Sequence, residues 1–270
     1  MDDEAIFSAW AVAIEAFLNW MQASGAVAGT LKVRRSKLRT LARHSRIAPW
    51  DVTRDHLIAW MNAHSWAKNT RQSSRTTVIM FYRWAKNEGL VDEDPAANLP
   101  RVRVPKAGPR PTPTTVYEEA LAQATERDRL MIRLGALGGL RRSEIAKVRG
   151  TDLGDDDVLR VVGKGSKVRL IPIVDRELLR ALNRAGGDYL FPGKIDGHIS
   201  PGHVGVLLSR VLGPGWTGHT LRHRCATRAF KGTRDLLAVQ ELLGHASPVT
   251  TAIYTAVPAN GVLDAVIAAA

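Results

Sequence analysis

The sequence predicts a mainly α-helical protein of two domains, with a small β-hairpin in the second domain. Three observations support this prediction. Apolar residues recur at helical spacing through residues 4–87, without a strand signal. Six prolines then interrupt residues 92–113, where no helix can continue. After them the helical pattern resumes, and Leu159–Ile173 adds two short β-rich runs around a Gly-Lys-Gly-Ser turn.

Four helices are expected in the first domain. The first covers residues 4–23, and the second, very basic one covers residues 30–44. Thr53 is a suitable N-cap for the third, which continues to about Ala63. The fourth covers residues 70–87. Tryptophans recur in this region, among them Trp10, Trp20, Trp60, Trp66 and Trp84. In a small bundle tryptophan is more typical of a core than of a surface on which bases stack.

The second half begins after an extended, basic and proline-rich linker, residues 92–113. A basic linker of this kind could also lie along DNA. Two helices precede the hairpin, at 114–124 and 127–138. The helices expected after the hairpin cover residues 175–185, 202–212, 220–230, 234–243 and 248–256.

The composition is that of a soluble globular protein and excludes several classes. The chain has 270 residues, 45% of them hydrophobic and 24% charged. No run of 18 apolar residues is present, so a membrane-spanning helix is not expected. The start, Met1–Glu4, is acidic and lacks the basic region of a signal peptide. Cys225 is the only cysteine, which excludes an intrachain disulfide and favours a reducing, cytoplasmic setting.

Positive charge is concentrated in residues 28–110, which hold 17 basic and 6 acidic residues of a chain whose net charge is +12. The densest part, Thr30–Arg46, contains seven basic residues and no acid. Such a stretch attracts the phosphates of nucleic acid, although a solvated helix face remains the alternative. The residues expected to bind DNA are Lys32, Arg34, Arg35, Lys37, Arg39, Arg43, Arg71, Arg75, Arg101 and Arg103.

Four stretches of the second half hold residues that could perform chemistry. In the first, two glycines end a helix and present Arg141, which could instead simply pair with Glu144. In the second, Lys164 lies at the tip of the hairpin, where a lysine is often only solvated. In the third, His219 and Arg222 share one helix face with a second histidine, at i, i+3 and i+4.

The fourth stretch contains His245 and Tyr254. Gly244 is a good helix stop, and Ser247 followed by Pro248 is a good start for the next helix. A single tyrosine on such a helix is usually a core residue. No metal site is expected from the two histidines of the third stretch, because no glutamate follows the first and no third ligand lies nearby.

Together these residue types suit phosphoryl transfer without a metal or other cofactor. Arginine forks bind phosphate oxygens and stabilise the charge of a five-coordinate phosphorus. Lysine or histidine can protonate a departing alkoxide, and a tyrosine hydroxyl can act as the nucleophile. The glycine-rich loop that holds nucleoside triphosphates is absent from the sequence.

The four stretches resemble, in order and spacing, the boxes of the tyrosine recombinase, or phage integrase, family. Gly139–Ile145 resembles the first arginine box, and Gly163–Pro172 the hairpin lysine segment. His219–Thr227 resembles the His-x-x-Arg box, and Leu242–Tyr254 the segment that ends in the nucleophile. Arg224-Cys225 departs from the uncharged or apolar pair that is common there, and Arg142 makes a double arginine.

The resemblance implies a role for each of six residues. Arg141 and Arg222 would hold the scissile phosphate, and Lys164 would protonate the leaving 5′-oxygen. His219 would assist proton transfer around the nucleophile, and His245 would contact the phosphate or position the nucleophile. Tyr254 would attack and form a 3′-phosphotyrosine.

It also implies a two-domain DNA clamp. Residues 1–91 would be a helical, SAM-like core-binding domain and residues 114–257 the catalytic domain, joined by the linker at 92–113. The apolar tail, residues 258–270, would dock on a neighbouring subunit, although docking on its own subunit is the alternative.

The implied partner is double-stranded DNA. The active assembly would be a homotetramer on two DNA sites, formed from a monomer or weak oligomer, with no membrane partner. An accessory DNA-bending or directionality factor could take part, and the location would be the nucleoid in the cytoplasm of a bacterial cell. A phage or prophage integrase is favoured over a Xer-type chromosome or plasmid dimer resolvase. Few residues precede the first helix, so a separate arm-binding domain is not expected, and this weakens the preference for an integrase. A type IB topoisomerase and a non-catalytic DNA-binding protein are less favoured alternatives.

Overall fold

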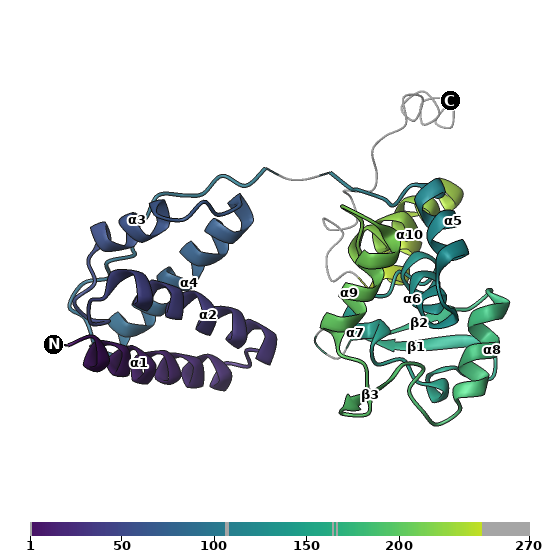
Figure 1. The fold of residues 1–270 in the computed structure, drawn as a ribbon, viewed down its shortest axis with the longest axis horizontal. Coiled ribbons are helices and arrows are strands. Elements are labelled where there is room, and N and C mark those ends of the chain that lie inside the picture. The colour runs from purple at the N-terminus through teal and green to yellow at the C-terminus, as the bar shows by residue number, and fades with distance from the viewer. Residues whose placement is uncertain (1, 106–107, 164, 166, 245–270) are drawn as a thin grey trace. The chain divides into compact units, whose positions relative to one another are not determined.

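A computed structural model divides the chain into two compact units, Met1–Lys106 and Ala107–Ala270 (Figure 1). It describes residues 2–105, 108–163, 165 and 167–244. Within these residues the fold is mainly helical, with one two-stranded sheet in the second unit, so the predicted fold class is confirmed. No helix in the described part is both long enough and apolar enough to cross a membrane.

The first unit contains the four predicted helices, with ends within two residues of those expected. They are α1 (Asp3–Ala23), α2 (Ala28–Ser45), α3 (Arg54–Asn62) and α4 (Lys68–Asn87). The predicted cap of α3 is confirmed, because the hydroxyl oxygen of Thr53 accepts a hydrogen bond from the third backbone N–H of the helix.

Aromatic side chains form the core of this unit. Trp10 and Trp60 are buried and Trp84 is 5% exposed, which confirms the core role predicted for them. The ring of Trp10 stacks on Phe81 with centroids 5.7 Å apart. Each such side chain contributes about 1.5–3 kcal/mol by leaving water. The prediction is wrong for Trp20, which lies on the outer face of α1 and is 43% exposed.

The second unit contains every predicted helix that falls within the described residues. These are α5 (Thr114–Gln123), α6 (Glu126–Ala136), α8 (Arg176–Ala185), α9 (Pro201–Leu212), α10 (Gly218–Thr233) and α11 (Leu236–Leu243). Three short elements were not expected, because a single turn or a four-residue strand is too short to establish a period. They are α7 (Arg142–Ile145), the 3-10 turn η1 (Gly150–Asp152) and β3 (Pro192–Ile195). The helix predicted at 248–256 lies outside the described residues.

The predicted hairpin is confirmed. Strand β1 (Val158–Val162) pairs antiparallel with β2 (Val168–Pro172). Leu159, Val161 and Ile171 point into the core of the unit and are buried, while the alternate positions face outward. The alternation therefore packs one face of the two strands on the core of the unit and leaves the other face exposed.

Within the second unit, helix α10 packs against α6 and α9, which Figure 1 labels beside it, and against α11. The contact with α6 is close because Gly135 leaves room for Leu221, whose Cβ would lie 3.3 Å from any Cβ at that glycine. Leu221 is fully buried. The first turn of α10, which carries the predicted histidine and arginine, is therefore fixed against the core.

Candidate active site

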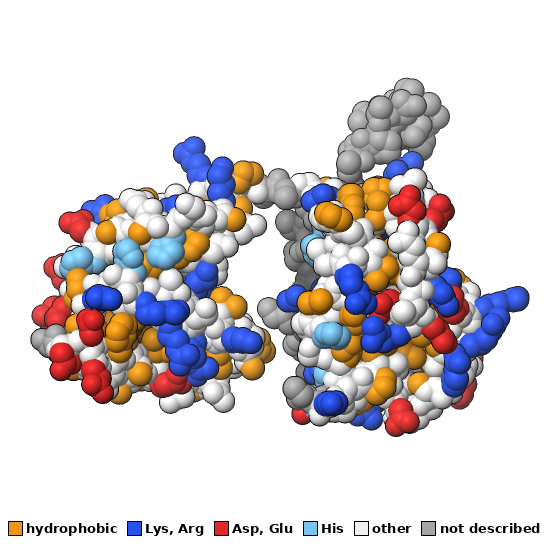
Figure 2. Space-filling view, in the orientation of Figure 1, with side chains coloured by type: hydrophobic (Ala, Val, Ile, Leu, Met, Phe, Trp, Pro, Cys, Tyr) orange, Lys and Arg blue, Asp and Glu red, His pale blue; other side chains and the backbone are white. Residues whose placement is uncertain are grey.

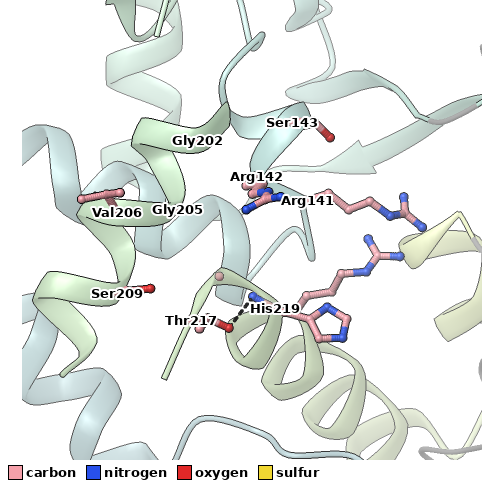
Figure 3. Close-up of a pocket in the computed structure, with 11 residues that line it drawn as sticks. Arg141, Arg142, Ser143, Gly202, Gly205, Val206, Ser209, Thr217 and His219 are labelled. Carbon is pink, nitrogen blue, oxygen red and sulfur yellow. Dashed lines mark hydrogen bonds between the residues drawn. The ribbon is translucent and has the colours of Figure 1, made fainter. Parts of the chain in front are cut away.

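Three of the six predicted catalytic residues line one hollow of the second unit, about 730 Å³ in volume. They are Arg141, His219 and Arg222. The hollow lies between α7, α9 and the first turns of α10, and Figure 3 shows Arg141 and His219 reaching it from different elements. The other lining residues are Arg142, Ser143, Gly202, Gly205, Val206, Ser209, Thr217 and Gly218.

Arg141 is presented by the break between α6 and α7, as the two glycines predicted. Gly139 has a φ of +62°, in the left-handed region that side chains disfavour. A Cβ there would also lie 2.6 Å from Cδ2 of Leu243. The chain therefore turns sharply at Gly139, and Arg141 becomes the N-cap of α7.

Arg141 also pairs with Glu144, which the sequence offered as the alternative to a catalytic role. Its backbone N–H and its Nη1 donate to the two carboxylate oxygens of Glu144, at 2.9 and 2.8 Å. The side chain of Glu144 is only 3% exposed, whereas that of Arg141 is 36% exposed. The buried carboxylate thus holds the arginine by one side and leaves the rest of the guanidinium accessible to the hollow. The two interpretations are compatible.

Arg169, which the sequence did not single out as a site residue, is a second cation that pairs with the same carboxylate. Its Nη2 donates to Glu144 at 2.7 Å, and its Nε donates to the carbonyl of Leu242 at 3.0 Å. Burial opposes ionisation of Glu144, but the hydrogen bonds from Arg169 and Arg141 outweigh it and lower its pKa. Arg169 occupies an inward position of β2, where the strand pattern calls for an apolar residue, and that mismatch was the available signal.

Arg222 is fixed by backbone carbonyls. Its Nη1 donates to the carbonyl of Gly139, and its Nη2 donates to that of Leu243 at 2.6 Å. The residue is 3% exposed, yet it lines the hollow. A buried guanidinium held by two carbonyls keeps its charge and has little rotational freedom. Arg222 therefore ties the end of α11 to the turn that presents Arg141.

His219 lies in the first turn of α10, where the hydroxyl oxygen of Thr217 accepts its backbone N–H at 3.2 Å (Figure 3). Its Nε2 is 2.9 Å from Nε2 of His223, which confirms that the two rings share one helix face. Burial and the charges of Arg222 and Arg141 lower the pKa of His219. Burial, His219 and Arg222 lower the pKa of His223 to about 4.

The end of the predicted linker lies on α10, and this contact accounts for one departure from the family pattern. We call residues 109–113 the strap. Within it, Thr112 is 1% exposed, and its backbone N–H donates to the carbonyl of Thr220 at 3.1 Å. The buried Arg224 donates to the carbonyl of Thr112 at 3.2 Å. A charged residue at position 224 therefore anchors the strap.

Lys164, His245 and Tyr254 lie outside the described residues, as does the predicted tail. The glycines directly before Lys164 and His245 are described, and their neighbours are known. A Cβ on Gly163 would lie 3.3 Å from Oε1 of Glu144, and a Cβ on Gly244 would lie 3.0 Å from Cδ of Arg169. The backbones that lead to Lys164 and His245 thus meet at the same ion pair that holds Arg141.

The basic residues predicted to bind DNA fall into two groups. Five are exposed, and three of these are on α2, where Figure 2 shows a band of Lys and Arg side chains over the first unit. The exposed residues are Lys32, Arg39, Arg43, Arg101 and Arg103.

The other five have partners within the first unit. Arg34 donates to the hydroxyl of Thr77 at 2.7 Å, and Arg75 donates to the carbonyl of Pro100 at 2.7 Å. Arg35 pairs with Glu15 at 2.7 Å, Arg71 donates to the carbonyl of His64 at 3.2 Å, and Lys37 lies 5.3 Å from the ring centre of Trp66. These contacts give each residue a structural role besides any contact with DNA.

The described residues contain no group of three or more His, Cys, Asp or Glu side chains placed to hold a metal ion. The free thiol of Cys225 is buried, which raises its pKa to about 11, and its Sγ lies 3.3 Å from the carbonyl oxygen of Leu137. It therefore packs as an apolar group behind Gly139, not as a nucleophile of the hollow.

Comparisons with known proteins identify the family to which this chain is similar. The model of the phage integrase family matches residues 114–260. The tyrosine recombinase XerC of Pseudomonas syringae pv. tomato is 31% identical over 247 residues, which cover 82% of this chain and 81% of that protein. XerC of Xanthomonas axonopodis pv. citri is 33% identical over 196 residues, 65% of this chain and 63% of that protein.

Two solved structures share the fold. A lambda integrase dimer bound to a COC′ core site gives a TM-score of 0.73 at 21% identity, covering 90% of this chain and 94% of that one. The XerH recombinase bound to its difH substrate gives a TM-score of 0.67 at 18% identity, covering 87% and 78%. At these identities the comparison concerns the fold alone.

Proposed function

The chain belongs to the phage integrase family and is a tyrosine recombinase, and on this premise we propose that it is an integrase that inserts phage or prophage DNA into a host chromosome. One observation carries the assignment of its active site. Arg141, His219 and Arg222 line one hollow, and the backbones that lead to Lys164 and His245 meet at the ion pair beside it. Three of the six proposed catalytic residues thus share one hollow, and the residues directly before two others, Gly163 and Gly244, support a common site.

We propose the following chemistry for DNA cleavage. The hydroxyl of Tyr254 attacks the scissile phosphorus, so that the bond from its oxygen to phosphorus forms while the bond from phosphorus to the 5′-oxygen breaks, and the phenolic proton passes to solvent water. Lys164 supplies the proton that the leaving 5′-oxygen needs. Arg141 and Arg222 donate hydrogen bonds to the non-bridging oxygens, whose charge grows in the transition state. His219 assists proton transfer near the nucleophile, and His245 contacts the phosphate or positions Tyr254.

The 3′-phosphotyrosine that results conserves the energy of the broken phosphodiester. The cut strand can therefore be joined again by the reverse reaction, in which the 5′-hydroxyl of a DNA strand displaces Tyr254 from the phosphate. This chemistry requires neither ATP nor a metal ion. The exposed guanidinium face of Arg141 and the carbonyl-held Arg222 suit a phosphate that enters from the hollow.

We further propose that residues 1–91 bind the core DNA site, that residues 92–113 connect to the catalytic part at 114–257, and that residues 258–270 dock on a neighbouring subunit. The exposed basic residues of α2 would contact phosphates on the same duplex. The active assembly would be a tetramer on two DNA sites in the bacterial nucleoid, where an accessory factor could set the direction of the reaction.

A Xer-type dimer resolvase is the second candidate, and the similarity to XerC proteins over four fifths of the chain favours it. The two reactions differ in their substrates. An integrase joins two unlike attachment sites, whereas a resolvase recombines two copies of one site. Recombination of paired plasmids that carry unlike or identical sites from the flanking DNA would distinguish them.

The active-site proposal is tested by covalent capture on a nicked DNA site, from which the cleaved strand end diffuses away. The wild-type protein should accumulate a covalent DNA adduct that protease digestion reduces to a tyrosine-linked peptide. Tyr254→Phe should bind the same DNA and form no adduct, because only the hydroxyl is removed. An adduct that persists in this variant would overturn the assignment of Tyr254.

A further inference from the structure

The strap forms one contact that reaches the active site itself. The backbone N–H of Arg110 donates to Nδ1 of His223 at 2.9 Å. Four neighbouring contacts hold the strap in place. Thr112 forms its two hydrogen bonds to Thr220, Arg224 donates to the carbonyl of Thr112, and the Arg110 guanidinium lies 4.6 Å from the ring centre of Trp216. The Arg110 N–H is therefore a fixed donor.

This donor determines where the protons of the two histidines lie. A backbone N–H can only donate, so Nδ1 of His223 must accept. A neutral imidazole carries one proton, which in His223 is then on Nε2. That atom is 2.9 Å from Nε2 of His219, and a hydrogen bond needs one donor and one acceptor. Nε2 of His219 accepts, and the proton of a neutral His219 is on Nδ1.

The surroundings of both rings favour their neutral forms. Burial first, and then the nearby charges of His219 and Arg222, lower the pKa of His223 to about 4. Burial, Arg222 and Arg141 likewise lower the pKa of His219. Protonation of either ring would place a third positive charge beside these two arginines. It would also disrupt the order of donors and acceptors in the hydrogen bonds that connect Arg110, His223 and His219.

We propose that His223 is a positioning residue, which uses the backbone N–H of Arg110 to fix His219 as the tautomer that carries its proton on Nδ1. The consequence for catalysis rests on the proposed function. With Nε2 engaged by His223, Nδ1–H is the nitrogen that His219 can offer to DNA. It can donate to a non-bridging phosphate oxygen and cannot accept a proton there. This narrows the role in proton transfer proposed above for His219, which would stabilise charge on the phosphate as a hydrogen-bond donor and would not itself take the proton of Tyr254.

The tautomer can be measured without DNA, by ¹⁵N NMR of the histidine side chains in the free, full-length protein at neutral pH. The test compares Arg110→Pro, which removes the N–H, with Arg110→Ala, which keeps it. Arg110 precedes Pro111 and is therefore in the extended region, where proline also fits. Both variants lose the contact with Trp216, so they differ chiefly in the donor.

Wild type and Arg110→Ala should show His219 protonated on Nδ1, and Arg110→Pro should show a mixture of the two tautomers. Protonation of His219 on Nε2 in the wild type would overturn the proposal. So would an unchanged tautomer in Arg110→Pro. These results do not depend on activity, so they stand even if the protein forms no adduct and the proposed function fails.

A second pair of variants tests whether the tautomer affects catalysis. His223→Gln retains a hydrogen-bond acceptor and a donor in one side chain. The leucine of His223→Leu fills a similar volume but has neither group. Cleavage of the nicked site should slow by about 10- to 100-fold in His223→Leu, the scale for misplacing a supporting partner or losing acid–base assistance. His223→Gln should recover most of that loss. Equal loss in both variants would mean that His223 only fills space.

Discussion

Helices α2 and α10 both carry several basic residues, but three of those on α2 are exposed whereas two of those on α10 are buried. On α2, Lys32, Arg39 and Arg43 are exposed to solvent. On α10, Arg222 and Arg224 are 3% and 7% exposed, and backbone carbonyls accept their hydrogen bonds. Exposed charges can follow any phosphate backbone, whereas charges fixed by the fold can bind one phosphate in one geometry.

This difference suggests a division of labour. Phosphate contacts from exposed side chains supply affinity that is independent of sequence and sensitive to salt. Guanidiniums that are already oriented supply transition-state stabilisation, because they need not reorganise as the charge develops. On this account α2 governs how tightly DNA binds and α10 governs how fast bound DNA is cut.

The largest expected effect is a contrast between two substitutions that conserve charge. Arg222→Lys keeps a cation but cannot donate to the carbonyls of Gly139 and Leu243 and to phosphate in the same fork geometry. Single-turnover cleavage should fall by about 10²-fold, the scale for losing one transition-state donor. Arg39→Lys on α2 should leave cleavage and binding close to wild type. A small loss in Arg222→Lys would contradict the fixed-fork account.

Acid should reveal the buried histidine of α10, His223. The pKa of His223 is lowered to about 4, so between about pH 6.5 and pH 4 the unfolded chain binds a proton that the folded chain does not. Folding stability should therefore fall as the pH drops through this window, by up to about 3 kcal/mol. The groups that face His223 are His219, Arg222 and the N–H of Arg110.

The measurement is denaturant unfolding at a series of pH values, with His223→Gln as the comparison. That variant should lose most of the pH dependence within the window, because it has no proton to gain. An equally steep dependence in the variant would place the titrating group elsewhere.

The smallest effect concerns the exposed charge of α2. Replacing Lys32, Arg39 and Arg43 by Gln removes up to three phosphate contacts and should reduce the slope of log affinity against log salt by about 2.7. Binding at several salt concentrations gives this slope. A control variant replaces three exposed basic residues elsewhere in the first unit, Arg54, Arg83 and Lys86. An equal change in the control would mean that net charge, and not α2, sets the salt dependence.

Helices were predictable because the recurrence of apolar residues with a period of about 3.6 can be recognised in one amino-acid sequence. The break at Gly139 was equally visible, since two successive glycines end α6. Arg141, His219 and Arg222 were found because their motifs lie in short, continuous stretches, and the hollow brings these stretches together.

What the sequence did not reveal depends on contacts between distant segments. Arg169 contacts Glu144 across 25 positions, and Arg110 contacts His223 across 113. No local pattern marks such partners. Charge counting likewise treated Arg34 and Arg75 as equal to Arg39, whereas the structure gives the first two internal acceptors. Short elements such as α7 have no period to detect.

The division of labour is tested most directly by measuring two quantities on the same two variants. These are the Kd for the DNA site and the single-turnover rate of adduct formation at saturating protein. The triple α2 variant should bind more weakly and cut at the wild-type rate once bound. Arg222→Lys should bind nearly as well as wild type and cut about 10²-fold more slowly. If the α2 variant is slow at saturation, or if Arg222→Lys is defective mainly in binding, the two helices do not divide the work as proposed.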